Sequence, residues 1–216
     1  MERIICVLIG YVFGIFQTGY LYGKLHNIDI RTKGSGNAGT TNALRTMGLK
    51  AGVVTFLGDA FKCIFAVVLV KAIYAHAHAD ALPMLAMYAG MGAVLGHNYP
   101  FYLNFKGGKG IAVTAGLLAS TLPLGLVIVC LLSFAIPVIF TKYVSVGSIV
   151  VVTVYLISVI VYGQAGGFGV SAECLMEMYL IAVFLLVSAV FRHRANIKRL
   201  INGTENKISI GKRKKQ

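Results

Sequence analysis

The stretch LGLVIVCLLSFAIPVIF, residues 124–140, carries no charged side chain and is long enough to cross most of a lipid bilayer as a helix. Further apolar stretches flank it on both sides, and 57% of the 216 residues are hydrophobic against only 12% charged. A soluble domain of this length cannot bury so much apolar surface, whereas lipid can solvate it. The sequence therefore predicts an all-α, polytopic integral membrane protein with seven transmembrane helices, at residues 4–22, 51–74, 81–95, 111–122, 124–140, 146–162 and 174–191.

Lys and Arg residues occur in alternate connecting segments. They lie between the first and second spans, the third and fourth, the fifth and sixth, and after the last span, whereas the other connections have none. The positive-inside rule then places the N-terminus outside and the C-terminus in the cytoplasm. This alternation requires an odd number of spans, which is the main reason to retain the short stretch at 111–122. A stretch of this length is expected to be tilted, partly embedded, or packed against protein rather than lipid. It also explains the net charge of +13 without nucleic acid as a partner.

The first apolar stretch is longer than the apolar core of a typical signal peptide, and no small-residue cleavage pattern follows it. We therefore expect it to remain as a helix. We expect one membrane domain, residues 1–205, and a basic cytoplasmic tail, residues 206–216. The four cysteines lack metal-ligand spacing, so we predict that they pack as small apolar residues and that the chain has no metal site.

Three polar segments interrupt the apolar stretches, on one predicted side of the bilayer. The first reads GSGNAGTTNALR, residues 34–45. Glycines let backbone N–H groups approach an anion, Ser, Thr and Asn add neutral donors, and Arg offers a planar fork for phosphate. A flexible loop is the alternative, but such loops rarely combine these residues so closely. The candidate phosphate-binding residues are Ser35, Gly36, Asn37, Thr41, Asn42 and Arg45.

The second polar segment reads GHNYPFYLNFKGGKG, residues 96–110. Two glycines between two lysines, at the start of the next helix, are typical of an anion-binding helix N-terminus. The spacing does not match a nucleotide-binding P-loop, so we do not predict nucleotide hydrolysis. A basic anchor at the membrane surface is the alternative. The candidate residues are Lys106, Gly107, Gly108 and Lys109.

The third polar segment begins RHRANIKRL, residues 192–200, and continues to Gly203 and Glu205. In a helix, His193, Asn196 and Arg199 lie near one face. Neighbouring cations disfavour the protonated form of His193, which leaves a neutral donor or base near pH 7. A basic cluster that only anchors the last span is the alternative, and we assign residues 212–215 to that role.

Other polar residues accompany these segments. Asp59 and Lys62 lie three residues apart within a span, and we expect them to form a structural ion pair. Ser145 and Ser148 face the same predicted compartment as the three polar segments. We expect both serines to help line a pocket there.

Together, the three segments resemble the motifs of the bacterial acyl-phosphate:glycerol-3-phosphate acyltransferase family. The patterns G-S-G-N-x-G-x-T-N-x-x-R, G-H-x-x-x…F-x-G-G-K-G and H-R-x-N-I-x-R-L-x-x-G-x-E occur in order at residues 34–45, 96–110 and 193–205. Any one of these motifs is weak alone, but three in order make the resemblance specific.

The resemblance implies a multi-pass enzyme of the bacterial cytoplasmic (inner) membrane, with its active site facing the cytoplasm. It would transfer a fatty acyl group from acyl-phosphate to the 1-hydroxyl of sn-glycerol 3-phosphate in phospholipid biosynthesis, without a cofactor. Its partners would be glycerol 3-phosphate, acyl-phosphate, membrane lipid and a peripheral enzyme that produces the acyl-phosphate. The implied catalytic residues are Ser35, Arg45, His193 and Asn196, with Lys106, Lys109 and Arg199 binding substrate.

The general base is left open between His193, a relay through Ser35, and an oxygen of a substrate phosphate. No His is followed by Asp five positions later, so the common acyltransferase dyad is missing. We favour direct transfer over an acyl-Ser35 intermediate, because no carboxylate is evident beside a Ser–His pair. A small transporter for an organic phosphate is the alternative function. It fits less well, because the anion-binding residues gather at one membrane surface and no internal repeat is evident.

Overall fold

The computed structural model describes residues 1–208, and helices with short connections account for this part of the chain, with no strand among these residues. The all-α prediction is therefore confirmed. Residues 212–215, and most of the predicted tail at 206–216, lie outside the described residues. The long helices are α1 (Glu2–Gly14), α4 (Leu49–Tyr74), α5 (Leu82–Asn98), α7 (Leu124–Thr141), α8 (Val144–Gln164) and α9 (Ala172–Arg192); shorter ones are α2 (Thr18–Leu25), α3 (Thr40–Met47), α6 (Ile111–Thr121), α10 (Arg194–Ile201) and the 3₁₀ turns η1 (Ile30–Thr32), η2 (Ala79–Ala81) and η3 (Phe101–Leu103).

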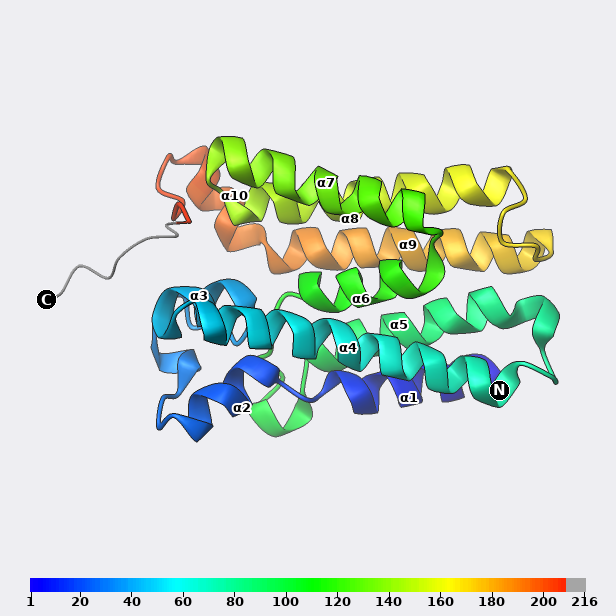
Figure 1. Cartoon of the computed structure of the whole chain (residues 1–216), viewed down its shortest axis with the longest axis horizontal. Coiled ribbons are helices and arrows are strands. Elements are labelled where there is room, and N and C mark those ends of the chain that lie inside the picture. Colours follow the sequence, from blue (N-terminus) through cyan, green and yellow to red (C-terminus); the bar gives the residue numbers. More distant parts are fainter. Residues whose placement is uncertain (209–216) are drawn as a thin grey trace, which may run out of the picture.

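Within residues 1–208, six helical segments are long and apolar enough to cross a membrane: Glu2–Leu25, Leu49–Tyr74, Ala79–Leu103, Leu124–Thr141, Val144–Gln164 and Ala172–Arg192. The stretch predicted at 111–122 forms α6, which has 11 residues. At 1.5 Å per residue it is about 16 Å long, roughly half of a bilayer core. Helix α6 therefore does not reach across a membrane alone. It lies in the middle of the bundle, against α4, α5, α7 and α8 (Figure 1).

Polar contacts satisfy the end of α6 inside the bundle. Lys71 of α4 donates from Nζ to the carbonyl of Ser120 at 2.8 Å. The hydroxyls of Ser120 and Thr121 donate to carbonyls one turn earlier in the helix, at 2.7 and 2.8 Å. Helix-terminal carbonyls need such partners where water is scarce. The short helix α6 can therefore end inside the bundle.

Close packing of α1 on α5 forms the largest helix contact. A Cβ added to Gly10 or Gly14 of α1 would fall within 2.3 Å of a backbone oxygen of α5, and one added to Gly92 or Gly96 of α5 would fall within 2.4 Å of a backbone oxygen of α1. Small residues on both surfaces let two backbones approach closely, as is common between membrane helices. This contact sets the position of the C-terminal end of α5, from which the second polar segment leaves.

The break between α1 and α2 is bridged by a buried ion pair. Lys62 donates from Nζ to Asp59 at 2.8 Å and to the carbonyl of Phe16 at 2.6 Å. The expected Asp59–Lys62 pair is confirmed. The Nδ1 atom of His97 from α5 lies 2.9 Å from the same Nζ, so the cluster joins three helices.

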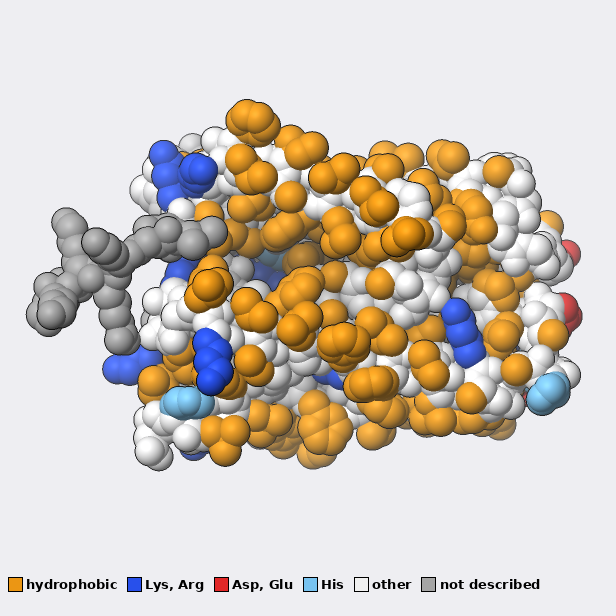
Figure 2. All heavy atoms as spheres, viewed as in Figure 1, with side chains coloured by type: hydrophobic (Ala, Val, Ile, Leu, Met, Phe, Trp, Pro, Cys, Tyr) orange, Lys and Arg blue, Asp and Glu red, His pale blue; other side chains and the backbone are white. Residues whose placement is uncertain are grey.

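The two ends of the bundle differ in charge. Helices α3 and α10 and the connection between α5 and α6 lie at one end, opposite the start of α1 (Figure 1). Figure 2 shows most of the visible Lys and Arg side chains at this end, acidic side chains at the other, and a largely hydrophobic surface between them. Phe65, Ile139 and Leu180, from three helices, are each more than half exposed. We call the end that holds α3, residues 99–110 and α10 the basic end.

Candidate active site

A cavity of about 320 Å³ opens at the basic end, where the three polar segments meet. They come from residues 34–45, 96–110 and 192–205 and converge because α4, α5 and α9 each begin or end there. Most of the residues predicted from the sequence line the cavity. These are Ser35, Asn37, Thr41, Asn42, Arg45, Lys109, His193, Asn196 and Arg199. Ser145 and Ser148 also line it, as expected.

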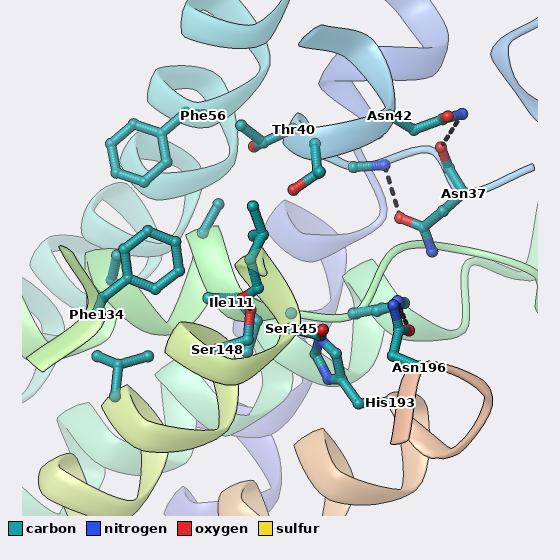
Figure 3. Close-up of a pocket in the computed structure, with 18 of the residues that line it drawn as sticks. Asn37, Thr40, Asn42, Phe56, Ile111, Phe134, Ser145, Ser148, His193 and Asn196 are labelled. Carbon is teal, nitrogen blue, oxygen red and sulfur yellow. Dashed lines mark hydrogen bonds between the residues drawn. The ribbon is translucent and has the colours of Figure 1, made fainter. Parts of the chain in front are cut away.

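The cavity is polar on one side and apolar on the other. Figure 3 shows the rings of Phe56 and Phe134 near each other on one side, with Asn37, His193 and Asn196 on the other. The apolar wall comes from α4, α6, α7 and α8. Its members include Phe56, Ile111, Ala115, Leu118, Leu131, Phe134, Val138 and Val151.

The first polar segment is shaped around the buried side chain of Asn42. Its Oδ1 accepts from the N–H of Ser35 at 2.9 Å, and its Nδ2 donates to the carbonyls of Ile30, Lys33 and Asn37 at 2.9 to 3.1 Å. With both amide atoms occupied, Asn42 organises the loop rather than binding a ligand. The loop in turn presents Ser35 to the cavity.

Gly36, Gly107 and Gly108 do not line the cavity, and their N–H groups already have partners. Gly36 donates to Lys33 O, Gly107 to Asn98 O and Gly108 to His97 O, at 3.0 to 3.2 Å. This corrects the prediction that these glycines present free N–H groups to a phosphate. Glycine is needed at 107 and 108 for space, because an added Cβ would fall 2.0 Å or less from the carbonyl or the ring of His97.

Lys106 and Lys109 have different surroundings. Lys106 is exposed and lies outside the cavity lining, whereas Lys109 points into the cavity and donates to Asn196 Oδ1. Burial lowers the pKa of Lys109 to about 8, against a partial opposing effect of Glu205. Of the two lysines, only Lys109 lines the cavity.

Glu205 ends the third motif, but no role in the site was predicted for it from the sequence. Its carboxylate accepts from Asn196 Nδ2 at 2.7 Å, Arg199 Nε at 2.8 Å and Ser145 Oγ at 3.2 Å. Burial acts to raise the pKa of Glu205, but these hydrogen bonds outweigh it and the pKa is lowered, so the carboxylate stays ionised. A single acidic residue directly after a basic helix was the available signal.

His193 is buried at the junction of α9 and α10, and Figure 3 shows its ring beside the cavity. Its Nδ1 lies 2.8 Å from the carbonyl of Ala189, so Nδ1 carries the proton and Nε2 is the acceptor of the neutral ring. Burial, followed by the nearby Lys109 cation, lowers the pKa of His193 to about 4. The predicted direction is confirmed, but the main cause is burial rather than neighbouring charge.

Arg45 lies across the cavity opening from α10. Its Nη2 donates to the carbonyl of Asn206 at 2.8 Å, which connects the first polar segment to the third. Arg199 is held by Glu205 from the other side. Together with Lys109, these residues place three cationic side chains around the polar part of one cavity, an arrangement suited to phosphate.

Comparison with known proteins identifies the family. A family model described as glycerol-3-phosphate acyltransferase matches residues 4–203. The chain belongs to the glycerol-3-phosphate acyltransferase family. A glycerol-3-phosphate acyltransferase of Clostridioides difficile (strain 630) is 42% identical over 207 residues, which cover 95% of each chain. One from Alkaliphilus metalliredigens (strain QYMF) is 39% identical, over 96% of this chain and 97% of the relative.

Solved structures of this family share the fold. A crystal structure of PlsY (YgiH), an integral membrane glycerol 3-phosphate acyltransferase in its glycerol 3-phosphate form, matches with a TM-score of 0.81 and 28% identity, over 97% of this chain and 96% of that one. The lysophosphatidic acid form matches with a TM-score of 0.78 and 27% identity, over 97% of each chain. The chain is thus a membrane-embedded enzyme of the acyltransferase class.

Proposed function

We propose that this protein transfers a fatty acyl group from acyl-phosphate to the 1-hydroxyl of sn-glycerol 3-phosphate. The products would be 1-acyl-glycerol 3-phosphate (lysophosphatidic acid) and inorganic phosphate. One observation carries the proposal: a single cavity joins a cationic part, at Arg45, Lys109 and Arg199, to an apolar part between Phe56 and Phe134. The related PlsY structures are a glycerol 3-phosphate form and a lysophosphatidic acid form, which correspond to the proposed acceptor and product.

Both parts of the cavity have a role in this reaction. The cationic part would bind the phosphates of the two substrates, and the apolar part would receive the acyl chain from the bilayer. The reacting carbonyl would then lie where the two parts meet, near Ser145 and His193. Holding two reactants in this geometry supplies several kcal/mol of the rate enhancement. Cations beside the departing phosphate and the developing oxyanion add to it.

Acyl-phosphate is a mixed anhydride, so its carbonyl is already activated. The 1-hydroxyl oxygen attacks the carbonyl carbon, the bond to the phosphate oxygen breaks, and phosphate leaves. The hydroxyl proton must go to a base. His193, with a pKa of about 4, is a weak one, whereas a phosphate monoester has its second pKa at about 6. We therefore assign the proton of the 1-hydroxyl to a substrate phosphate oxygen. His193 Nε2, which can only accept, would take a hydrogen bond from the neighbouring 2-hydroxyl and so hold glycerol 3-phosphate in place.

Ser35 fits a binding role better than a covalent one. Its N–H is fixed by Asn42, and the hydrogen bonds of residues 1–208 pair its hydroxyl with no His or carboxylate. An acyl-Ser35 intermediate would need such a partner to activate the oxygen. Direct transfer between the two bound substrates remains our proposal, with Ser35, Arg45 and Lys109 on phosphate and Asn196 positioning glycerol 3-phosphate.

The proposal includes an orientation in the bacterial inner membrane. The basic end would face the cytoplasm, with the N-terminus outside and seven crossings of which α6 is a partial one. Two features support this: Lys and Arg gather at one end, and the chain starts at the opposite end from α10. A cytoplasmic opening would admit glycerol 3-phosphate and allow functional coupling to a peripheral enzyme that makes acyl-phosphate.

A reconstitution assay tests the proposed reaction. Purified protein in lipid, given glycerol 3-phosphate and synthetic palmitoyl-phosphate, should produce lysophosphatidic acid and phosphate in equal amounts with no further component. Acyl-CoA in place of the acyl-phosphate should give no product. Transfer only from acyl-CoA would contradict the proposed donor. Uptake of glycerol 3-phosphate into vesicles without any acyl transfer would instead support a transporter.

A further inference from the structure

Lys109 lies in the connection between α5 and α6, residues 99–110. Helix α5 holds one side of this connection, which we call its inner face. The N–H groups of Gly107 and Gly108 donate to the carbonyls of Asn98 and His97, at 3.2 and 3.0 Å. The His97 ring packs so closely under Gly108 that a Cβ there would lie 1.9 Å from Nε2. The same ring contacts Lys62, within the buried cluster that joins α4, α5 and the break between α1 and α2. This face of the connection is therefore fixed to the centre of the bundle.

Arg192, the last residue of α9, holds the outer face. Its Nη2 donates to the carbonyl of Gly107 at 2.9 Å and to that of Gly108 at 2.6 Å, and its Nε donates to Gly108 at 3.1 Å. The guanidinium also lies over the Tyr99 ring, 5.2 Å from its centroid. Bonds from a charged fork to two successive carbonyls restrict both the position and the direction of the turn.

Arg192 is not among the residues that line the cavity. Lys109 follows the restrained turn directly and donates to Asn196, which lies four residues after Arg192 in the chain. Two polar segments that are far apart in sequence are thus joined twice: outside the cavity by Arg192 and inside it by Lys109. Loss of the hydrogen bonds from Arg192 would free one side of the turn, so the backbone of Lys109 would no longer be held in one position.

We propose that Arg192 is a positioning residue, which holds the Gly107–Gly108 turn so that Lys109 meets the substrate phosphate. The assignment rests on the proposed function in one respect, the identity of the anion that Lys109 binds. The restraint on the turn is independent of that identity. Arg194 provides a matched comparison, because it is exposed and its Nη1 donates only locally, to the carbonyl of Phe191 at 3.2 Å.

Charge gives a second consequence. The groups that act on the Lys109 ammonium are Glu205, which raises its pKa, and the cations Arg199, Arg192 and Arg45, which lower it; neutral Asn196 bonds to it directly. Replacing Arg192 by a neutral residue removes one of these cations and loosens the turn toward water. Both changes raise the pKa of Lys109, so the alkaline decline in activity should move to higher pH.

The test compares Arg192→Gln with Arg194→Gln in the full-length protein. For Arg192→Gln we expect the KM for glycerol 3-phosphate to rise about tenfold or more, since hydrogen bonds from a charged group are lost. The pH at which activity declines on the alkaline side should rise, and the backbone amides of Gly107 and Gly108 should exchange hydrogen with solvent faster. Arg194→Gln should match the wild type in all three. Arg192→Lys keeps the positive charge but loses the planar guanidinium. We therefore expect its KM for glycerol 3-phosphate to rise, while its activity should decline at nearly the same alkaline pH as in the wild type.

Unchanged KM and unchanged amide exchange in Arg192→Gln would overturn the proposal. If that variant does not fold, Arg192→Lys decides the question, since wild-type KM and exchange there would equally overturn it. If the wild-type protein transferred no acyl group, the proposed function would be wrong. The hydrogen-exchange measurement would still show whether Arg192 restrains the Gly107–Gly108 turn.

Discussion

Two glycine-rich loops lie at the basic end, the first within residues 34–45 and the second within residues 96–110. They look alike in sequence but need glycine for different physical reasons. In the first loop, Gly34 and Gly36 adopt positive φ angles of 58° and 71°, which ordinary side chains rarely adopt. In the second, Gly107 and Gly108 have ordinary backbone angles but no room for a side chain against His97. Gly36 is therefore needed for a change of direction in the first loop, whereas Gly107 and Gly108 are needed for close packing in the second.

This difference decides how each loop presents its functional side chain. The first loop is shaped mainly by its own residues, through the amide of Asn42. The second loop is hydrogen-bonded to α5 on one side and to Arg192 on the other, so contacts with other elements fix its conformation. Substitutions in the second loop should therefore be transmitted further through the structure.

Gly107→Ala should have the largest effect. The new Cβ would fall 2.0 Å from the backbone oxygen of His97, so the loop must move and carry Lys109 with it. A displacement of about 1 Å in a catalytic site can cost about a hundredfold in rate. We expect an activity loss of about that size or larger, with a lower Tm, measured on purified protein. Gly125→Ala is the matched control, since no atom lies within 4 Å of its added Cβ.

Glu205→Gln should have the next largest effect. The carboxylate accepts from Arg199 and Asn196 at once, and an amide cannot accept from both in the same way. Hydrogen bonds to a buried charged group contribute about 1.5 to 3 kcal/mol. We expect a lower Tm and a KM for glycerol 3-phosphate raised about tenfold. Wild-type KM in this variant would show that Asn196 and Lys109 are positioned without Glu205.

Gly36→Ala should be milder. The nearest atom to the added Cβ is the carbonyl oxygen of Arg31 at 3.1 Å, so the main cost is the positive φ, about 1 to 2 kcal/mol. We expect a reduced free energy of unfolding and less than about a tenfold loss of activity. Gly203→Ala isolates the φ cost, because Gly203 has a φ of 67° and no atom within 4 Å of the Cβ position. If Gly36→Ala were as damaging as Gly107→Ala, the distinction between the two loops would be wrong.

The smallest effect should be a change in pH dependence. Lys109, with its pKa lowered to about 8, loses its charge as the pH rises through that value. Transfer at low glycerol 3-phosphate should therefore decline above about pH 8, and Lys109→Arg should remove that decline, because a guanidinium stays charged. An identical alkaline limb in both proteins would assign the decline to another group.

The features that follow from local chemistry were predictable from sequence. Continuous apolar stretches such as 124–140 predicted the helices, and the spacing of His193, Asn196 and Arg199 predicted a shared helix face, as α10 and the cavity lining confirm. These predictions depend only on periodicity and hydropathy. The three polar segments were likewise correctly expected to meet.

The missed features depend on contacts between segments far apart in the chain. The sequence already showed that the stretch at 111–122 is short, but hydropathy could not show that α6 packs inside the bundle, because residues buried in protein and residues facing lipid are equally apolar. Sequence also could not show that the N–H groups of Gly107 and Gly108 bond to α5. Arg192 was given no role of its own from the sequence, and nothing there indicated that its partners are two carbonyls 84 and 85 residues earlier.

The central claim, that three segments enclose one substrate site, can be tested by cysteine protection. Thr40→Cys, Ile111→Cys and Ile208→Cys each place a thiol in the cavity lining, on different segments, while native Cys174 marks the opposite end of the bundle. A membrane-impermeant maleimide should label the three introduced thiols only from the cytoplasmic side, and glycerol 3-phosphate should protect all three with the same half-effective concentration. Labelling from the other side, or protection at one position and not at the others, would contradict a single shared site.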